Sequence, residues 1–234
     1  MITKTIPLVA IAIAFCLPRA FAADPMAPIN PAAYKAPVRV ACIGDSITQG
    51  VGAAKGKSWP AQLQEILGSS WVVGNFGVSA RTLLKKGDHP YWIEKAYKNA
   101  LAFKPDVVII MLGTNDTKPK NWQHKDEFVP DYTELVKSFL ALDSKPRVFV
   151  CRPTPVPEPG NYGINETNVK VEIKWIDALA KKMNLGVIDM HAALEGKPKL
   201  LGDRVHPNTE GAGLMAAAAA TVLTGKPAAV PAAH

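Results

Sequence analysis

Cysteine is scarce in this chain of 234 residues, which contains only three of them. Cys16 lies near the N-terminus, whereas Cys42 and Cys151 lie inside short apolar runs. Buried free thiols at Cys42 and Cys151 are therefore favoured over a disulfide framework. The His, Cys and Asp residues also show no cluster with the spacing of a metal site. We predict no metal and no cofactor.

Blocks of like charge and long apolar runs are missing as well. The formal net charge is +7, but the basic residues are spread along the chain. This distribution lacks the concentrated basic surface of a nucleic-acid-binding protein, so we expect no nucleic-acid partner. The apolar run from Ile6 to Leu17 is too short to span a bilayer comfortably.

That N-terminal run has the features of a signal peptide over residues 1–22. Lys4 gives a positive start, and Ala20-Phe21-Ala22 provides the small-x-small pattern of a cleavage site. We predict export to the periplasm or the medium, without membrane insertion after cleavage; a retained anchor is the alternative. Loss of Lys4 and Arg19 would lower the formal charge from +7 to +5.

The rest of the chain is organised as one domain. Residues 23–37 contain four prolines and no apolar periodicity, and they are expected to form a leader or wrapping segment. Strands and helices then alternate over residues 38–226, and residues 227–234 form a tail. Strands are predicted at 38–43, 71–76, 106–112, 147–152 and 186–189, and helices at 58–67, 89–103, 126–140, 165–183 and 208–223. This alternation predicts a flavodoxin-like α/β/α sandwich around a five-stranded parallel sheet.

Polar residues follow the strands at the points where ligands bind in such sheets. Ser46 follows the first strand, Gly77 the second and Asn115 the third, while Asp203 and His206 follow the fifth. Each pattern alone has a structural explanation, such as a helix cap, an Asx turn or a loop. Their occurrence together, each at the carboxyl end of a strand, instead favours a catalytic site.

Four blocks carry a resemblance to the SGNH (GDSL-type) hydrolase family. They are Gly44-Asp45-Ser46, Asn75-Phe76-Gly77-Val78-Ser79, Gly113-Thr114-Asn115-Asp116 and Asp203-Arg204-Val205-His206. The resemblance covers the chain from about Val38 to Leu223. The segment from Gly77 to Trp92 looks most like the sialate O-acetylesterase-like branch. One departure is Ala80, where many relatives have a second glycine.

The resemblance implies a serine esterase with an acyl-enzyme intermediate. It assigns Ser46 as nucleophile, His206 as general base and acid, and Asp203 as the partner of His206. It assigns the oxyanion hole to the backbone N–H groups of Ser46 and Gly77 and to the side chain of Asn115. These residue types suit the chemistry, because a serine hydroxyl needs an adjacent base and an oxyanion needs fixed donors.

The neighbours of these residues are expected to be structural. We predict that Asp45 braces the Ser46 turn and that Asp116 braces the loop of Asn115. His191 is expected to be a hydrogen-bonded structural histidine.

The substrate is less well defined by the sequence. No long apolar lid is visible, and we predict short-acyl esters, with O-acetyl groups on a small or polymeric carbohydrate as the leading candidate. Arg81, Lys85 and Lys86 could meet an acidic substrate, but a solvated basic face is the favoured interpretation. Trp92, Trp122 and Tyr162 could stack on a sugar or simply pack. The loop over residues 153–163 is expected to border the cleft.

Three other functions fit parts of the pattern. A lysophospholipase or acyl-thioesterase would keep the same triad. A non-catalytic carbohydrate-binding protein would lack at least one triad or oxyanion residue, and none is missing. A flavodoxin-like cofactor binder needs a glycine-rich first loop, which this chain does not have.

Overall fold

The computed structural model describes residues 24–35 and 37–231. The predicted signal peptide, residues 1–22, lies outside this part. Among the described residues, no helix combines the length and apolar character needed to cross a membrane.

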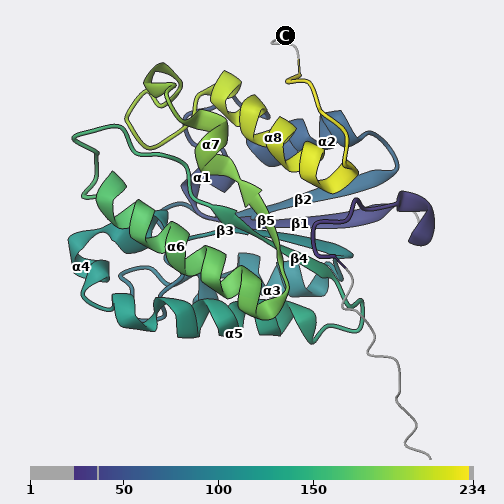
Figure 1. The fold of residues 1–234 in the computed structure, drawn as a ribbon, viewed down its shortest axis with the longest axis horizontal. Helices are drawn as coiled ribbons and strands as arrows, with labels where there is room; N and C mark the ends of the chain where they lie inside the picture. The colour runs from purple at the N-terminus through teal and green to yellow at the C-terminus, as the bar shows by residue number, and fades with distance from the viewer. Residues whose placement is uncertain (1–23, 36, 232–234) are drawn as a thin grey trace, which may run out of the picture.

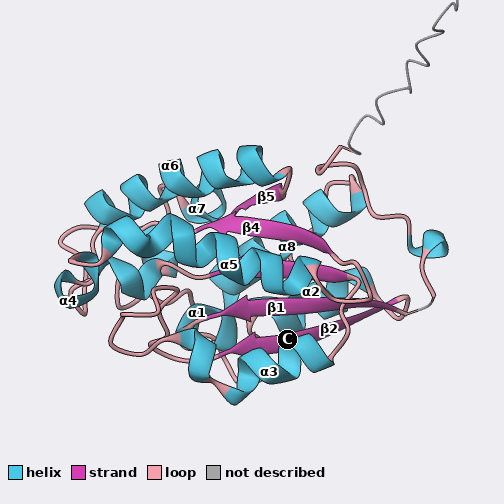
Figure 2. Cartoon of the chain, turned by 90° about the horizontal axis from the view of Figure 1, so that it is seen from below, coloured by secondary structure: helices cyan, strands magenta, loops and turns pink. Residues whose placement is uncertain are grey.

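The described chain is built on one parallel sheet of five strands. These are β1 (Val38–Gly44), β2 (Trp71–Gly77), β3 (Val107–Met111), β4 (Arg147–Arg152) and β5 (Gly186–Asp189). Their spatial order is β2-β1-β3-β4-β5, and every neighbouring pair is parallel. The strand arrows in Figure 2 accordingly point the same way. The predicted flavodoxin-like sheet is confirmed, and its order reverses at β1 and β3.

Helices cover both faces of the sheet, as Figure 1 shows. They are α1 (Ser46–Gln49), α2 (Trp59–Leu67), α3 (Lys95–Ala102), α4 (Pro119–Trp122), α5 (Phe128–Leu140), α6 (Glu166–Met183), α7 (Met190–Leu194) and α8 (Thr209–Thr224). Short 3-10 helices span Pro31–Ala33, Tyr91–Ile93, Thr114–Thr117, Lys125–Glu127 and Pro198–Leu200. Helices α2, α7 and α8 pack on one face, and α3, α5 and α6 on the other.

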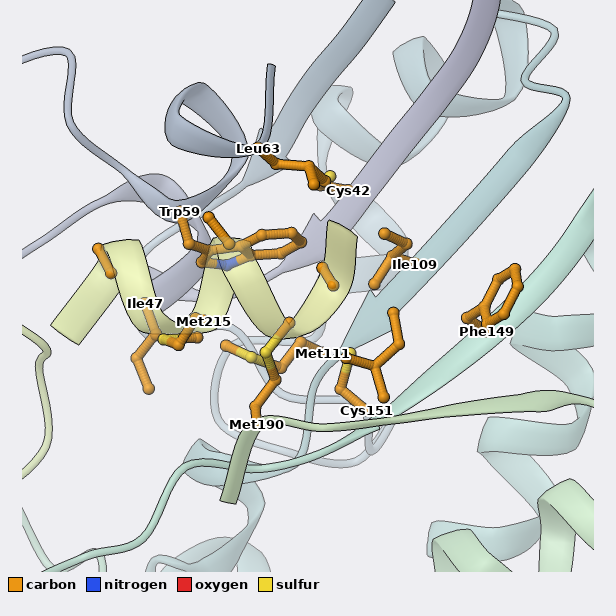
Figure 3. Close-up of a cluster of buried hydrophobic side chains, with 14 of the residues drawn as sticks. Cys42, Ile47, Trp59, Leu63, Ile109, Met111, Phe149, Cys151, Met190 and Met215 are labelled. Atoms are coloured by element: carbon orange, nitrogen blue, oxygen red, sulfur yellow. The ribbon is translucent and has the colours of Figure 1, made fainter. Parts of the chain in front are cut away.

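The two faces have separate hydrophobic cores because side chains alternate along each strand. In β1, Val40 and Cys42 join the core under α2 and α8, whereas Ala41 and Ile43 join the opposite core. Figure 3 shows part of the first core, with Cys42 and Cys151 among its side chains. Both thiols are free and buried, as predicted, and burial raises the pKa of each.

Most predicted helices agree with the structure, but the helix predicted at 89–103 is wrong in its first half. There the chain forms a 3-10 turn over Tyr91–Ile93 and only then α3. Two features prevent a continuous helix. Pro90 pairs with Thr82 in an isolated bridge, and Glu94 has an extended backbone with ψ of 145°.

The segment before β1 packs against the domain. Ile29 is buried, and its N–H donates to the Leu223 carbonyl at 2.7 Å. The Arg147 guanidinium donates to the Pro25 carbonyl at 2.8 Å. The described part of the leader therefore wraps across α8 and β4 instead of extending away from them.

One acidic side chain is buried without compensation. Glu172, on α6, is fully buried, and neither carboxyl oxygen has a hydrogen-bond partner in the described part of the chain. It lies beneath the loop after β3, because a Cβ on Gly113 would stand 2.7 Å from Glu172 Oε2. Burial, followed by the charges of Asp116 and Asp45, raises the pKa of Glu172 well above 4.5.

This burial predicts a dependence of stability on pH. The folded state holds the Glu172 proton more tightly than the unfolded state does, so the free energy of unfolding should decrease as the pH rises above 4.5. In Glu172→Gln that decrease should be shallower. Urea unfolding at pH 5 and pH 8 measures the difference, with exposed Glu210→Gln as the charge control. Equal slopes in wild type and Glu172→Gln would contradict the assignment.

Candidate active site

The carboxyl ends of the strands bring the sequence-predicted residues to one edge of the sheet. A pocket of about 210 Å³ lies there. Its lining includes Ser46, Asn115 and His206, together with Ser79, Ala80 and Tyr162. The four sequence blocks are therefore neighbours in space, although residues 46 and 206 are 160 positions apart.

Ser46 occupies the first turn of α1, directly after β1. The Asp45 carboxylate caps this helix by accepting the N–H of Ile47 at 2.9 Å. Gly50 ends the helix in the left-handed conformation, with φ of 107°. This short turn presents Ser46 at the pocket with 8% of its surface exposed. The prediction that Asp45 braces the Ser46 turn is confirmed.

His206 connects Ser46 to Asp203 through short hydrogen bonds. His206 Nε2 lies 2.8 Å from Ser46 Oγ, and His206 Nδ1 lies 2.6 Å from Asp203 Oδ2. Asp203 Oδ1 also accepts the backbone N–H groups of Val205 and His206, at 3.0 and 2.7 Å. With this geometry a proton can pass from Ser46 to His206 while Asp203 stabilises the resulting imidazolium.

The pKa of Asp203 reflects these contacts. Partial burial raises it, but the hydrogen bonds from the His206 ring and from the backbone of His206 and Val205 outweigh burial and lower it to about 2. Asp203 therefore remains a carboxylate throughout the neutral range.

The proline-rich loop closes one side of the pocket. The Tyr162 hydroxyl donates to Asp203 Oδ2 at 3.2 Å, and its ring centroid lies 5.9 Å from that of His206. The Asn161 side chain donates to the Asp203 carbonyl at 2.9 Å. The expectation that residues 153–163 border the cleft is confirmed, and the loop also contacts the predicted triad.

Gly77 lies at the end of β2 and does not line the pocket. Its N–H donates to Asn75 Oδ1 at 2.9 Å. A Cβ at this position would stand 2.3 Å from the Gln49 nitrogen and 2.8 Å from the Asp45 carbonyl. Glycine is therefore required here for the close approach of β2 to the Ser46 turn.

Ala80 borders the pocket three residues further on. Its φ of 65° is in the left-handed region, which is unusual for a residue with a side chain. Within the described residues its N–H donates to no acceptor. Sequence reasoning noticed Ala80 only as a departure from the family pattern, because the direction of one N–H group depends on the folded loop.

Asn115 lies in the 3-10 helix after β3, and its side chain lines the pocket. Its amide nitrogen stands 3.2 Å from Asp45 Oδ2 and 3.2 Å from the Arg81 carbonyl. Asn121, which sequence reasoning missed, donates to the Asn115 carbonyl at 2.8 Å. These contacts fix the amide beside Ser46.

Asp116 braces the Asn115 loop, as predicted, by tying it to the segment after the glycine block. Its carboxylate accepts the N–H groups of Leu83 and Leu84 at 3.0 and 2.7 Å, which fixes the segment after the glycine block. Burial is the main reason that the pKa of Asp116 is raised, to about 7. Burial likewise raises the pKa of Asp45 to about 6, against the opposing effect of the Ile47 N–H and of the His206 and Lys118 charges.

Several other candidates have structural roles. His191 is buried, and its Nε2 lies 2.8 Å from Glu166 Oε1, which agrees with a structural histidine. Trp122 stacks on Trp175, and Trp92 donates to the Leu83 carbonyl; neither lines the pocket. In the described ranges, no group of three or more His, Cys, Asp or Glu side chains could hold a metal ion.

Comparison with known proteins gives consistent matches. The GDSL-like lipase/acylhydrolase family matches residues 42–214. An acetylxylan esterase from Xylanibacter ruminicola is 45% identical over 207 residues, which are 80% of this chain but 43% of that protein. The chain thus spans less than half the length of this relative.

Solved structures resemble the fold. Est24, a carbohydrate acetylesterase from Sinorhizobium meliloti, superposes with a TM-score of 0.65 at 25% identity, covering 78% of this chain and 96% of its own. The native aryl esterase from M. smegmatis gives a TM-score of 0.64 at 25% identity, with the same coverages of 78% and 96%.

The close approach at Gly77 generates a prediction about stability. In Gly77→Ala the new methyl group would overlap the backbone of the Ser46 turn, so we expect the free energy of unfolding to decrease by about 1–3 kcal/mol. Gly202→Ala is the matched control, because a Cβ there meets nothing within 4 Å. Thermal unfolding of both variants measures the effect. Equal melting temperatures for the two would contradict the close-approach explanation.

Proposed function

The chain belongs to the GDSL-like lipase/acylhydrolase family, and from that premise we propose that it is a carbohydrate acetylesterase that acts through Ser46, His206 and Asp203. Its membership of a family of carboxylic ester hydrolases gives the reaction class. The observation that carries the proposal is the continuous chain of hydrogen bonds from Ser46 Oγ through His206 to Asp203, located in a small pocket.

The proposed reaction has two halves. In the first, His206 Nε2 takes the proton of Ser46 as Oγ attacks the acetyl carbonyl, and the tetrahedral intermediate then collapses. The C–O bond to the sugar breaks, His206 gives its proton to the departing sugar oxygen, and acetyl-Ser46 remains. In the second half, a water molecule loses a proton to His206 and attacks the acetyl-enzyme. Acetate leaves and Ser46 regains its proton.

The oxyanion needs donors that are already in place. The Ser46 N–H is in the first turn of α1, and the Asn115 amide lies at the pocket. Its two hydrogens face Asp45 and the Arg81 carbonyl at 3.2 Å each, so one of these contacts would be exchanged for the oxyanion. The family resemblance assigned the third donor to Gly77, but Gly77 does not line the pocket and its N–H donates to Asn75. The free Ala80 N–H at the pocket lining is the better third donor, and we assign it that role.

The shape of the pocket favours a short acyl group. Its apolar lining comes from Val51, Ile164 and Val205, and its volume of about 210 Å³ is small. An acetyl methyl fits such a space, whereas a lysophospholipid or fatty acyl thioester needs room for a long chain. The likeness to an acetylxylan esterase points in the same direction. Export, which would give access to polysaccharide outside the cell, remains a prediction from the sequence.

Removal of the nucleophile or the base should abolish turnover without unfolding the protein. We expect Ser46→Ala and His206→Ala each to reduce kcat on p-nitrophenyl acetate by at least about a thousandfold, because residues of a triad act as a unit. Ser69→Ala, a change at an exposed serine, should keep the wild-type rate. Steady-state kinetics of the folded variants on p-nitrophenyl acetate measure kcat. A Ser46→Ala protein with the wild-type rate would refute the proposal.

The acyl-chain preference distinguishes the proposed acetylesterase from its alternatives. Across p-nitrophenyl esters from acetate to palmitate, kcat/KM should be highest for acetate, since longer chains exceed the pocket. Ile164→Ala should widen the pocket and shift the optimum toward butyrate. A wild-type optimum at long chains would instead support the lysophospholipase or thioesterase alternative. Absence of activity on every ester would support a binding role.

A further inference from the structure

We infer that Lys118 and Tyr162 form a subsite for a carboxylate-bearing sugar, so that the preferred substrate is an O-acetylated uronic acid residue. This inference rests on the proposed function, since it concerns the sugar that carries the acetyl group. It depends on which charges near Ser46 are neutralised and which are not.

The basic residues that follow the glycine block are all neutralised. Arg81 pairs with Glu94 at 2.7 Å, Lys85 with Glu134 at 2.6 Å and Lys86 with Glu127 at 2.6 Å. Lys85 and Lys86 are exposed, as a solvated face requires, but Arg81 is half-buried, and the ion pairs leave no basic face at these three positions. None of them lines the pocket.

Lys118 differs from these three residues both in its ion pairing and in its position at the pocket. It lines the pocket together with Ser46 and His206, and it forms no ion pair in the part of the chain that the structure describes. The residue is half-buried. A cation at the edge of a low-polarity pocket without a protein anion is well suited to receive an anionic group from the substrate.

The backbone of Lys118 is firmly held. Its N–H donates to the Asn115 carbonyl, and its own carbonyl accepts the N–H groups of Asn121 and Trp122 at 2.9 and 2.8 Å. Its side chain passes close to the proline-rich loop, because a Cβ on Gly163 would lie 3.9 Å from Lys118 Cγ. The Lys118 side chain thus starts from a backbone held by the same loop that carries Asn115.

The acids nearest to the serine do not neutralise Lys118. Burial raises the pKa of Asp45, and the charge of Lys118 is one of the effects that lower it. That carboxylate, however, is fully buried and accepts hydrogen bonds from the Ile47 N–H and the Asn115 amide. Asp203 is engaged by His206 and by the Tyr162 hydroxyl. The charge of Lys118, a lining residue of the pocket, is therefore not neutralised by any acid that the structure describes.

Tyr162 provides the complementary apolar surface. Its ring lines the same pocket and is 58% exposed, while the hydrogen bond to Asp203 holds its orientation. Sugar rings pack their C–H faces against exposed aromatic rings. The pocket therefore suits a pyranose that carries both an acetyl ester and a carboxylate. The sugar ring would pack on Tyr162, the carboxylate would pair with Lys118, and the ester would meet Ser46. A lysine suits a single carboxylate because it acts as a compact point charge.

The test compares two esters that differ only at C6. One is a mono-O-acetylated methyl glucoside and the other is the corresponding mono-O-acetylated methyl glucuronide. At low ionic strength we expect wild-type kcat/KM to be about threefold to tenfold higher for the glucuronide. In Lys118→Met that preference should disappear. In 1 M salt, where the Debye length is about 3 Å, it should also be strongly reduced in the wild type.

Lys120→Met is the matched control. It removes the same charge two residues away, from an exposed side chain that does not line the pocket, and should retain the preference. A second measurement uses p-nitrophenyl acetate with glucuronate or glucose as the inhibitor. Glucuronate should inhibit the wild type more strongly than glucose does, and Lys118→Met should lose this difference.

The outcomes separate this inference from the proposed function. Equal wild-type rates on the two sugar esters would overturn the subsite and leave the acetylesterase proposal intact. An equal loss of preference in Lys118→Met and Lys120→Met would also overturn it, because the effect would then come from net charge. Failure of the wild type to hydrolyse either sugar ester or p-nitrophenyl acetate would overturn both.

Discussion

The geometry of the pocket depends on the buried carboxylate of Asp45. Burial of an anion costs on the order of several kcal/mol unless hydrogen bonds compensate it. Here the compensating groups are the Ile47 N–H, which fixes the Ser46 turn, and the Asn115 amide, which brings the loop after β3 to that turn. Asp116 connects the same loop to Leu83 and Leu84 in a similar way. Two buried acids therefore join segments that the sheet alone would leave independent.

Much of this arrangement could be predicted from the sequence, for identifiable reasons. Continuous apolar runs such as 107–111 are typical of strands covered on both faces, and capping residues such as Asn165 and Asn208 mark helix starts. Ser46, Asp203 and His206 could be predicted to lie together because the carboxyl ends of parallel strands meet at one edge, while their proposed roles came from the resemblance of the four blocks. The break at Glu94 was not predictable, since it depends on the Thr82–Pro90 bridge.

What could not be predicted depends on the folded path of the chain, which the residue pattern does not show. Asn75 accepts the N–H of Gly77, whereas the N–H of Ala80 has no acceptor among the described residues, and this difference depends on the folded loop. No feature of the sequence indicated Lys118, because its importance lies in the lack of an ion-pair partner among the residues that the structure describes. Both Lys118 and Tyr162 belong to connecting segments, which can change without disturbing the strands that position the reacting groups.

The two buried thiols make the survival of the folded protein depend on whether its surroundings are oxidising. Cys42 and Cys151 lie in neighbouring regions of one core, and burial keeps both protonated and out of reach of oxidants. Only an opening of the sheet exposes them. An oxidised sulfur is larger and more polar than the thiol, and the core positions would not accept it on refolding. In oxidising surroundings each such opening risks permanent loss of the molecule, so the rate of unfolding, more than its equilibrium, sets how long the protein survives.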